Sequence, residues 1–506
     1  MYRFLARGSS LALAVALAAC NGGSTGAVAP ISAPTVSSAT LANPPEVVSS
    51  AGVANLTLTS AIDPRTGGPA LEYDGAFVPP TIRVSPGDTI DITYVNALPA
   101  ASSESLNLTN LHFHGLSVSP NPPADDSIDI AAMPGQTLHY QIPIPPSLPP
   151  GLYWYHSHAH LEANWQVYNG MSGAIVVNGV ASAAPETAGL PERVIVLRNV
   201  LADPTFSELS LHRRTEARGR SAGDGICAMP FNIPGEYTTI NGQKAPTTIL
   251  MQPGKKQFWR VVNASADGFY DLHIDGVNLH VVSIDGVPIS LYPGAQENNV
   301  PDYLLPPAGR VEFTVTGPAS PSATFYTTCY DTGPAGDPNP PQILGSIVQG
   351  APALPTVPAS GPTPLARGTY EQPIGTPVQR HSVVFTENAA GTEFFLNGKQ
   401  YSPTAGPMFT VKSGTVEEWT LQNQTSEVHA FHIHQVHFIV LDIDGAAQPP
   451  HWTDTITLPI QHADGTPSAT HVLIDFRDPL VRGTFLFHCH LLEHEDGGMM
   501  AKVSVQ

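Results

Sequence analysis

The sequence predicts an all-β fold built from three consecutive β-sandwich domains. Its 506 residues are enough for about three domains of roughly 150 residues, each large enough to bury a core. The 51 prolines and 44 glycines are too many helix breakers for a helix bundle and favour short strands joined by turns. A sequence unit that occurs three times supports the same architecture.

This repeated unit recurs at spacings of about one domain length. In each copy a Gly lies between two segments of alternating polarity, and an Asn ends the second segment at a constant offset from the Gly. The copies are Ile82–Asn96 around Gly87, Ile249–Asn263 around Gly254, and Phe409–Asn423 around Gly414. Alternation on both sides of a tight Gly turn is typical of strands in a β-sandwich. Three matches with one offset indicate a repeated domain.

The repeat divides the chain into three units, with a proline-rich linker before the last. We expect domains at residues 51–182, 190–350 and 377–506, and the linker at 351–376. Further matches show that the outer units keep histidine-rich motifs and that the middle unit has lost them, with Asp275 standing where the third unit has His434. We therefore expect the middle domain to serve as a spacer.

The N-terminus has the composition of an export signal. Arg3 and Arg7 precede an apolar run, Leu11–Ala19, that is too short to be a transmembrane helix. The run ends in Leu-Ala-Ala-Cys at Cys20, which resembles the lipobox of bacterial lipoproteins, whose Cys is lipidated and becomes the mature N-terminus. We expect a lipoprotein-type signal peptide at residues 1–20. Ordinary signal cleavage beside a chance Cys is the alternative.

The segment that follows, residues 21–50, is rich in Ser, Ala, Pro, Thr and Val and predicts a flexible tether. We therefore expect an exported protein of the bacterial cell envelope, either periplasmic or anchored in the outer membrane as a lipoprotein. Contact with the membrane is expected only through a lipid on Cys20. Export permits a disulfide, and Cys227 and Cys329 could pair, although the sequence does not show it.

The net charge limits the possible partners. A formal charge of −20 excludes nucleic-acid binding as the main role of the surface. The sequence leaves the oligomeric state open. Histidine, with 20 copies against 22 Lys and Arg together, points instead to chemistry that uses imidazole.

Four His-x-His pairs carry that chemistry. Alternate side chains of a strand share a face, so each pair directs two imidazoles at one place. A single pair would more often be structural, but four pairs at matching positions of the outer units indicate metal ligation. The pairs are His112/His114, His156/His158, His432/His434 and His488/His490.

The segment 488–499 is the strongest metal signal. Alternation places Cys489 on the strand face opposite its two flanking histidines, so one segment serves two metal centres. The second centre would be formed by Cys489 and His494, joined by His429 and a weak axial Met499. A His2Cys set with an axial Met is typical of blue copper. Zinc is the alternative, but its structural sites close with four ligands and would leave the other eight histidines unexplained.

Those eight histidines, four from each outer unit, are enough for a cluster of three metals with two or three imidazoles each. Both units can supply ligands only if the first and third domains meet. One blue copper and three clustered coppers hold four electrons, which is the number needed to reduce dioxygen to two waters. The ligand set therefore indicates an oxidase.

Together these motifs resemble those of the multicopper oxidase family, in its three-domain bacterial laccase-like type. They are HFHG (112–115), WYHSH (154–158), HAFHIH (429–434) and HCHLLEHEDGGMM (488–500), and WTDTITLP (452–459) resembles the family's strand leading to the last motif. The resemblance covers roughly residues 55–180 and 380–506. It implies three cupredoxin-like Greek-key β-sandwich domains and four copper ions: one type 1, one type 2 and two type 3.

The resemblance also implies which residues hold each copper. Type 1 copper would bind His429, Cys489, His494 and Met499, and type 2 copper would bind His112 and His432. One type 3 copper would bind His114, His156 and His490, and the other would bind His158, His434 and His488.

The implied activity is one-electron oxidation of a phenol or similar reductant at type 1 copper, coupled to four-electron reduction of dioxygen to water at the trinuclear cluster. The expected partners are dioxygen and a small reductant, which is a phenol, an aromatic amine or a metal ion. Asp125 and Glu495 match positions where relatives carry acids beside the cluster, and both are candidate proton-relay residues. A solvated acidic loop is the alternative for each.

The main alternative function is that of a metallo-oxidase acting on cuprous, ferrous or manganous ions in copper tolerance or metal homeostasis. Relatives specialised for cuprous ion often carry a Met-rich insert, whereas this chain has 8 Met, of which only Met499 and Met500 are adjacent. This favours organic reductants. A non-catalytic relative is disfavoured because all ten candidate histidines and Cys489 are present. A copper store is disfavoured because Cys489 would link a redox centre to an oxygen site.

Overall fold

The computed structural model describes residues 40–102, 105–201, 236–337, 339–358 and 368–506. The predicted signal peptide, Cys20 and Cys227 lie outside these residues, so the export signal and the lipid anchor stay predictions. Cys329 is disulfide-bonded, and its partner is also outside them. Among the described residues, no helix has the length and apolar content that crossing a membrane requires.

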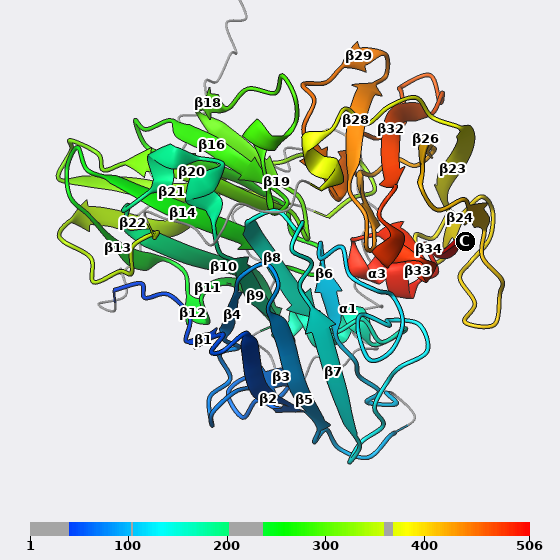
Figure 1. The fold of residues 1–506 in the computed structure, drawn as a ribbon, viewed down its shortest axis with the longest axis horizontal. Helices are drawn as coiled ribbons and strands as arrows, with labels where there is room; N and C mark the ends of the chain where they lie inside the picture. The colour runs from blue at the N-terminus through cyan, green and yellow to red at the C-terminus, as the bar shows by residue number, and fades with distance from the viewer. Residues whose placement is uncertain (1–39, 103–104, 202–235, 338, 359–367) are drawn as a thin grey trace, which may run out of the picture. The chain divides into compact units, whose positions relative to one another are not determined.

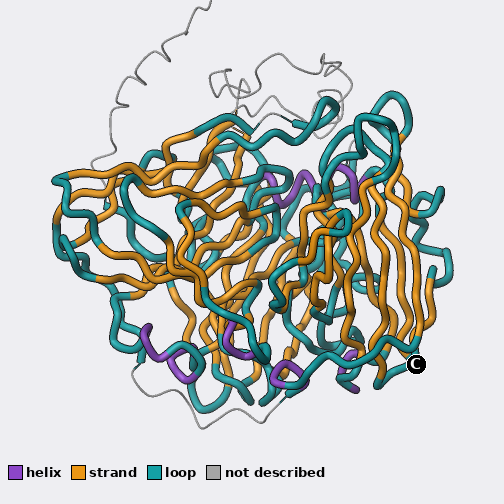
Figure 2. The backbone as a smooth tube through the Cα atoms, turned by 90° about the horizontal axis from the view of Figure 1, so that it is seen from above, coloured by secondary structure: helices purple, strands orange, loops and turns teal. Residues whose placement is uncertain are grey.

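Strands dominate the described chain, and its helices are short (Figure 2). The α-helices are α1 (Ala163–Tyr168) and α3 (Leu492–Asp496). The 3-10 helices are η1 (Val180–Ser182), η2 (Pro185–Thr187), η4 (Ile289–Leu291), η5 (Thr369–Glu371) and η6 (Pro479–Val481). The strands form six sheets within the described residues, and these sheets group along the chain into three sandwiches, coloured blue to cyan, green, and yellow to red in Figure 1. The fold is all-β, as predicted.

The first sandwich lies at the N-terminal end of the described chain. Its strands are β1 (Glu46–Val48), β2 (Val53–Ile62), β3 (Pro69–Glu72), β4 (Thr81–Val84), β5 (Thr89–Asn96), β6 (His112–His114), β7 (Thr137–Pro143), β8 (Gly151–His156) and β9 (Ser172–Val177). They form the sheets β1-β4-β9-β8-β6 and β3-β2-β5-β7. Side chains of both sheets, such as Ile82 and Ile92, share one core. Alternate residues of β5 are buried, as expected for a strand with one face on a core.

The second sandwich follows it directly. Its strands are β10 (Glu192–Leu201), β11 (Glu236–Ile240), β12 (Gln243–Lys244), β13 (Thr247–Met251), β14 (Lys256–Asn263), β15 (Tyr270–Ile274), β16 (Leu279–Ile284), β17 (Val287–Pro288), β18 (Asn298–Val300), β19 (Asp302–Leu305), β20 (Arg310–Thr316), β21 (Ser322–Thr328) and β22 (Gln342–Gln349). One sheet is β12-β11-β10-β14-β20-β16-β17 with β18 beside β16, and the other is β13-β22-β21-β15-β19. Trp259 and Phe325 meet edge to face across its core, with ring centroids 5.4 Å apart.

The third sandwich ends the chain. Its strands are β23 (Gln379–Glu387), β24 (Phe394–Leu396), β25 (Phe409–Val411), β26 (Thr415–Asn423), β27 (His429–Ile433), β28 (Phe438–Ile443), β29 (Ala446–Ala447), β30 (Trp452–Thr453), β31 (Thr455–Leu458), β32 (Ser468–Phe476), β33 (Gly483–Cys489) and β34 (Met500–Val505). One sheet is β24-β23-β26-β32-β28-β29 with β30 beside β28, and the other is β25-β34-β33-β27-β31. Trp419 and Phe487 lie in its core, which also contains Cys489.

The three sandwiches repeat one topology. In each, the strand after the repeated Gly runs parallel to the first long strand of its sheet, as β5 does with β2, β14 with β10, and β26 with β23. Gly87, Gly254 and Gly414 have φ values of 92°, 68° and 87°, a conformation that a side chain would strain. At each of these glycines the chain crosses from one sheet to the other. The predicted repeat is confirmed.

The Asn that ends each repeat makes the same buried contacts in all three sandwiches. The Oδ1 atom of Asn263 accepts from the backbone N–H of Ser265 at 3.0 Å, and its Nδ2 donates to the carbonyls of Gly268 and Leu305 at 2.7 and 3.0 Å. Equivalent contacts are made by Asn96 and Asn423. The Asn thus ties the turn after its strand to a second loop.

Part of the predicted tether is ordered, so that prediction was wrong for residues 41–48. Leu41 is 2% exposed and lies in the core of the second sandwich, and its N–H donates to the carbonyl of Thr248 at 2.7 Å. Within the same segment, β1 pairs in parallel with β4, and Val47 is buried. The few apolar side chains of the segment are sufficient to dock it, which its average composition did not reveal.

The predicted linker is also anchored at its C-terminal end. Tyr370 is buried, and its hydroxyl lies 2.7 Å from the hydroxyl of Ser117 and 3.0 Å from Nδ1 of His437. Its carbonyl accepts from the indole N–H of Trp452 at 3.0 Å. The linker therefore contacts both the first and the third sandwich next to the histidine motifs.

Replacing Asn263 with Ala will leave three buried backbone groups without partners. At about 1 kcal/mol or more for each group, we expect a loss of about 3 kcal/mol in the free energy of unfolding. Urea denaturation of the copper-free protein measures it. Asn299→Ala, on exposed β18 of the same sandwich, is the control and should change stability by less than about 0.5 kcal/mol. Equal effects of the two substitutions would contradict the role given to the repeated Asn.

Candidate metal centres

Two strand pairs carry the histidine motifs. In the first sandwich β6 and β8 pair so that His112 lies opposite His156. In the third, β27 and β33 pair so that His432 lies opposite His488. The two sandwiches meet at these pairs, because Nε2 of His158 lies 3.2 Å from Nε2 of His488. The first and third domains therefore approach each other as the ligand count requires.

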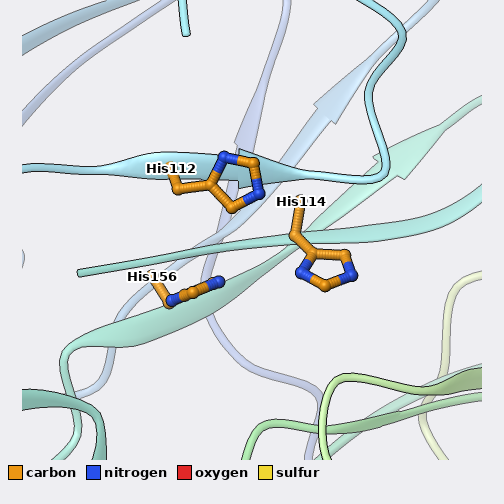
Figure 3. A group of neighbouring side chains, drawn as sticks. All are labelled: His112, His114 and His156. Carbon is orange, nitrogen blue, oxygen red and sulfur yellow. The ribbon is translucent and has the colours of Figure 1, made fainter. Parts of the chain in front are cut away.

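The first sandwich contributes a compact group of rings. His112, His114 and His156 lie together, with ring centroids 5.4 to 5.8 Å apart (Figure 3). His112 stacks on His434 of the third sandwich, and His114 stacks on His432, each with centroids 3.7 Å apart. Each His-x-His strand of one sandwich thus faces a His-x-His strand of the other.

The nitrogen atoms of this eight-histidine cluster fit metal ions. Groups of ring nitrogens lie within 4.8 Å of one another, as in His112/His114/His156, His112/His432/His434 and His158/His434/His488. All eight side chains are at most 1% exposed. Several of their nitrogens have no hydrogen-bond partner in the described part of the chain, namely Nε2 of His112, His156 and His432, Nδ1 of His114 and His158, and both nitrogens of His490. Buried polar atoms are normally paired, so converging unpaired nitrogens indicate a cation site.

The electrostatics of the cluster keep these rings in the form that binds metal. Burial, followed by repulsion from neighbouring rings, holds the pKa of His434 and of His490 well below the usual value. Burial lowers the pKa of His488 to about 3. Neutral imidazole is the ligand form, and the lowered pKa values of His434, His488 and His490 favour it.

The structure brings together every histidine set that the resemblance implied for the cluster. Nε2 of His434 lies 3.2 Å from the Nε2 atoms of both His158 and His488. The ring of His490 lies 5.2 Å from that of His114 and 5.3 Å from that of His156. The rings of His112 and His432 are 6.0 Å apart. Which copper each set holds stays a prediction.

A second centre lies on the other face of β33. Sγ of Cys489 is 3.6 Å from Nδ1 of His429 and from Nδ1 of His494, and these two nitrogens are 3.1 Å apart. Cys489 is a free, fully buried cysteine. Met499 is also fully buried, and its carbonyl accepts from the N–H of Cys489 at 3.0 Å. Because residues 488 and 490 belong to the cluster, one strand carries ligands for both centres.

Carboxylates surround the outer edge of this second centre. Nε2 of His494 lies 3.0 Å from Glu427 and 3.7 Å from Glu493. Burial lowers the pKa of His494, but Glu427 and Cys489 outweigh it and raise that pKa well above its usual value. A small cavity reaches His494 and is lined by acids that include Asp267, Asp337, Glu427 and Glu493. The edge from which a reductant could reach the centre is therefore strongly acidic.

The two candidate relay acids both lie beside cluster histidines. The carboxylate of Asp125 is 3.0 Å from Nδ1 of His112 and accepts from Nε2 of Gln435 at 2.5 Å. The carboxylate of Glu495 is 3.2 Å from Nδ1 of His488 and 3.6 Å from Nδ1 of His158. Burial, followed by the neighbouring Asp496, raises the pKa of Glu495 well above its usual value. The buried site therefore favours the protonated form of Glu495.

Two further residues at the cluster were missed from the sequence. Asp454 lies 3.2 Å from Nε2 of His114 through its carboxylate and 2.8 Å from Nδ1 of His432 through its carbonyl. It forms a buried ion pair with Arg310, which belongs to β20 of the second sandwich. Asp454 is part of the WTDTITLP motif, whereas the signal for Arg310 was only a charged residue in an apolar strand. The middle domain is thus more than the spacer that we expected.

Comparison with known proteins agrees with this geometry. Profiles of the multicopper oxidase family match residues 58–182, 210–351 and 374–506. The chain is 26% identical over 491 residues to a laccase of Bacillus subtilis, covering 86% of this chain and 89% of that protein. It is 24% identical over 478 residues to the multicopper oxidase MmcO of Mycobacterium tuberculosis, covering 88% of this chain and 87% of that protein.

Solved structures show the same fold. A multicopper oxidase of Campylobacter jejuni, described as a metallo-oxidase, superposes with a TM-score of 0.69 at 23% identity, covering 92% of this chain and 94% of that one. The multicopper oxidase McoA of Aquifex aeolicus gives a TM-score of 0.71 at 20% identity, covering 93% of this chain and 100% of that one. The family matches span most of this protein, which belongs to the multicopper oxidase family.

Proposed function

We propose that this protein is a laccase-like oxidase, which couples one-electron oxidation of phenols or similar organic reductants to four-electron reduction of dioxygen to water. The observation that carries the proposal is the position of Cys489. Its sulfur lies between His429 and His494 on one face of β33, while its two chain neighbours belong to the eight-histidine cluster on the other face. Such a strand joins an electron-accepting site to an oxygen-reducing site through a few covalent bonds.

The donor sets fit four copper ions. We assign His429, Cys489, His494 and Met499 to type 1 copper and His112 and His432 to type 2 copper. We assign His114, His156 and His490 to one type 3 copper and His158, His434 and His488 to the other. Copper in these sets supplies the one-electron redox chemistry that the reaction needs. The protein supplies buried imidazole nitrogens and the buried sulfur of Cys489.

Proton supply is assigned to Glu495 and Asp125. Reduction of dioxygen to water consumes protons, and Glu495 lies buried next to His158 and His488 in surroundings that favour its protonated form. Asp125 occupies the corresponding position next to His112. General acids positioned in this way contribute about 10²–10⁴-fold to rates.

A second candidate is oxidation of metal ions, and the acids at His494 favour it. Glu427 is almost fully buried, and although burial opposes ionisation, attraction to His494 lowers its pKa to about 2. It therefore stays ionised and contacts a ligand of the proposed type 1 copper. A carboxylate at this position attracts ferrous or cuprous ions, as well as protonated aromatic amines, more strongly than neutral phenols.

The main proposal predicts a blue protein. The copper-loaded chain should hold four copper ions and absorb at about 600 nm, as copper–thiolate sites do. Cys489→Ser should abolish this band and the oxygen uptake on a phenol, because the sulfur ligand of the blue site is lost, while about three copper ions remain. Ser157→Ala, at the matching position of the first unit, should keep the band. A colourless wild-type protein with its full copper content would show that the oxidase assignment is wrong.

The relay assignment predicts a defect confined to the oxygen half of the reaction. Glu495→Gln and Asp125→Asn should each lower oxygen turnover about 10²-fold, with an unchanged blue band. Reduction of the blue site by a phenol under nitrogen should keep its wild-type rate, and this serves as the internal control. Normal oxygen turnover in both variants, with intact copper spectra, would refute the relay role.

The second candidate predicts a change of preference at Glu427. Glu427→Gln should lower kcat/KM for ferrous ion about tenfold more than kcat/KM for a neutral phenol, since about 1.4 kcal/mol of attraction to the cation is lost. Glu418→Gln removes a partly buried acid of the same sandwich that pairs with Arg380 and should leave the ratio unchanged. An unchanged ratio in the Glu427 variant would remove the support for metal-ion oxidation.

A further inference from the structure

We propose that Arg310, from the sandwich without metal ligands, is a positioning residue of the histidine cluster. It fixes Asp454, and Asp454 in turn fixes the orientation of His114 and His432. The inference rests on the proposed copper sites, because the two histidines are assigned there to type 3 and type 2 copper. It gives the middle domain a direct part in shaping the cluster.

Asp454 determines which nitrogen of each histidine remains free. Its carboxylate Oδ1 lies 3.2 Å from Nε2 of His114, and its carbonyl accepts from Nδ1 of His432 at 2.8 Å. The opposite nitrogens, Nδ1 of His114 and Nε2 of His432, are buried without a partner among the described residues. One residue therefore fixes the tautomer and the ring angle of two ligands, as outer partners of metal-bound histidines do.

Arg310 holds the carboxylate of Asp454 through a two-pronged contact. Nη1 donates to Oδ1 at 2.7 Å and Nη2 donates to Oδ2 at 2.6 Å, and both side chains are fully buried. This planar pair of parallel hydrogen bonds fixes the plane of the carboxylate as well as its position. A Lys, with a single charged nitrogen, could not reproduce it.

The guanidinium is itself held by two sandwiches. Nη1 also donates to the carbonyl of Ala308 at 3.2 Å, and Nε donates to the carbonyl of Leu152 in β8 at 3.4 Å. Asp285 lies 3.4 Å from Nη1 and accepts the backbone N–H of Arg310 at 2.8 Å. Contacts from the first and second sandwiches thus leave the side chain little freedom to move.

The space around the pair is closed by the Gly of the HFHG motif. A Cβ on Gly115 would lie 2.4 Å from Nη2 of Arg310 and 2.8 Å from Oδ2 of Asp454. Thr455 completes the contacts of Asp454 by donating from Oγ1 to Oδ1 at 2.9 Å. The chain next to His114 is therefore shaped to admit the guanidinium, which a purely peripheral ion pair would not require.

An ion pair that only joined the domains would predict a different outcome from substitution. In that case loss of Arg310 would lower stability and leave the cluster unchanged wherever the protein folds. A positioning role predicts a changed type 2 site even in a variant that folds normally. The type 2 copper signal in electron paramagnetic resonance separates the two roles without relying on activity.

The experiment compares Arg310→Lys and Arg310→Met in the full, copper-loaded chain. We expect both variants to keep the blue band, to show a shifted type 2 signal or a copper content near three instead of four, and to lose at least tenfold in oxygen turnover. The KM for a phenol should not change. Arg310→Lys should retain more of the wild-type signal than Arg310→Met.

Arg260→Met is the matched control. Arg260 is a fully buried arginine of the same sandwich. Its ion pairs are with Glu192 and Glu312 and do not involve Asp454. It should lower stability and leave the type 2 signal as in the wild type. If Arg310→Met does not fold, the type 2 copper signal of Arg310→Lys alone tests the positioning role.

Wild-type type 2 signals in the Arg310 variants, or an equal change in Arg260→Met, would overturn the positioning role. A wild-type protein that binds no copper at the cluster would instead overturn the proposed function, so the two failures are distinguishable.

Discussion

The burial of eight imidazoles in one space between two sandwiches is the constraint on which the proposed function depends. Burial, followed by repulsion from neighbouring rings, disfavours protonation of His434 and His490. The free nitrogens have no hydrogen-bond donors among the described residues, which is costly unless a cation occupies the centre. The apolar cores beside the cluster provide the rigidity, and buried acids such as Asp125 and Asp454 hold ring nitrogens that point away from the centre.

The strand period explains why two centres of different chemistry lie back to back. His488 of β33 and His490 just after it face the first sandwich, while Cys489 faces the core of the third, where His429 and His494 approach its sulfur. No insertion or separate domain is needed to connect them, because adjacent residues of a strand point to opposite faces. The acids at His494 lie on the Cys489 side of β33, whereas Asp125 and Glu495 lie beside the histidine cluster, so under the proposed function the acids near the reductant are separate from the relay acids.

Local periodicity made most of the ligand set predictable from the sequence. The members of each His-x-His pair are two residues apart, and Cys489 lies between the members of the last pair. The repeated Gly and Asn located the sandwiches. The roles of Asp454 and Arg310 were not predicted, because they depend on a contact between two residues of different domains, 144 positions apart in the chain. No local spacing in the sequence encodes such a contact. The tether was misjudged for a related reason: Leu41 is one of a few large apolar residues in a segment rich in Ser, Ala, Pro and Thr, and only the second sandwich shows where it binds.

The middle sandwich shows how a repeated domain can lose its ligands and still be required. It keeps the Gly turn at Gly254 and the buried Asn263, so its fold follows the same rules as its neighbours. Its Asp285 accepts from the backbone N–H of Arg310, and Arg310 reaches across to Asp454. A fully buried arginine is costly unless carboxylates face it, and one of the two that do so here is placed beside a cluster histidine. Removing the middle domain would therefore leave Asp454 buried without its counter-charge, so the outer domains depend on the middle one although it contributes no ligand.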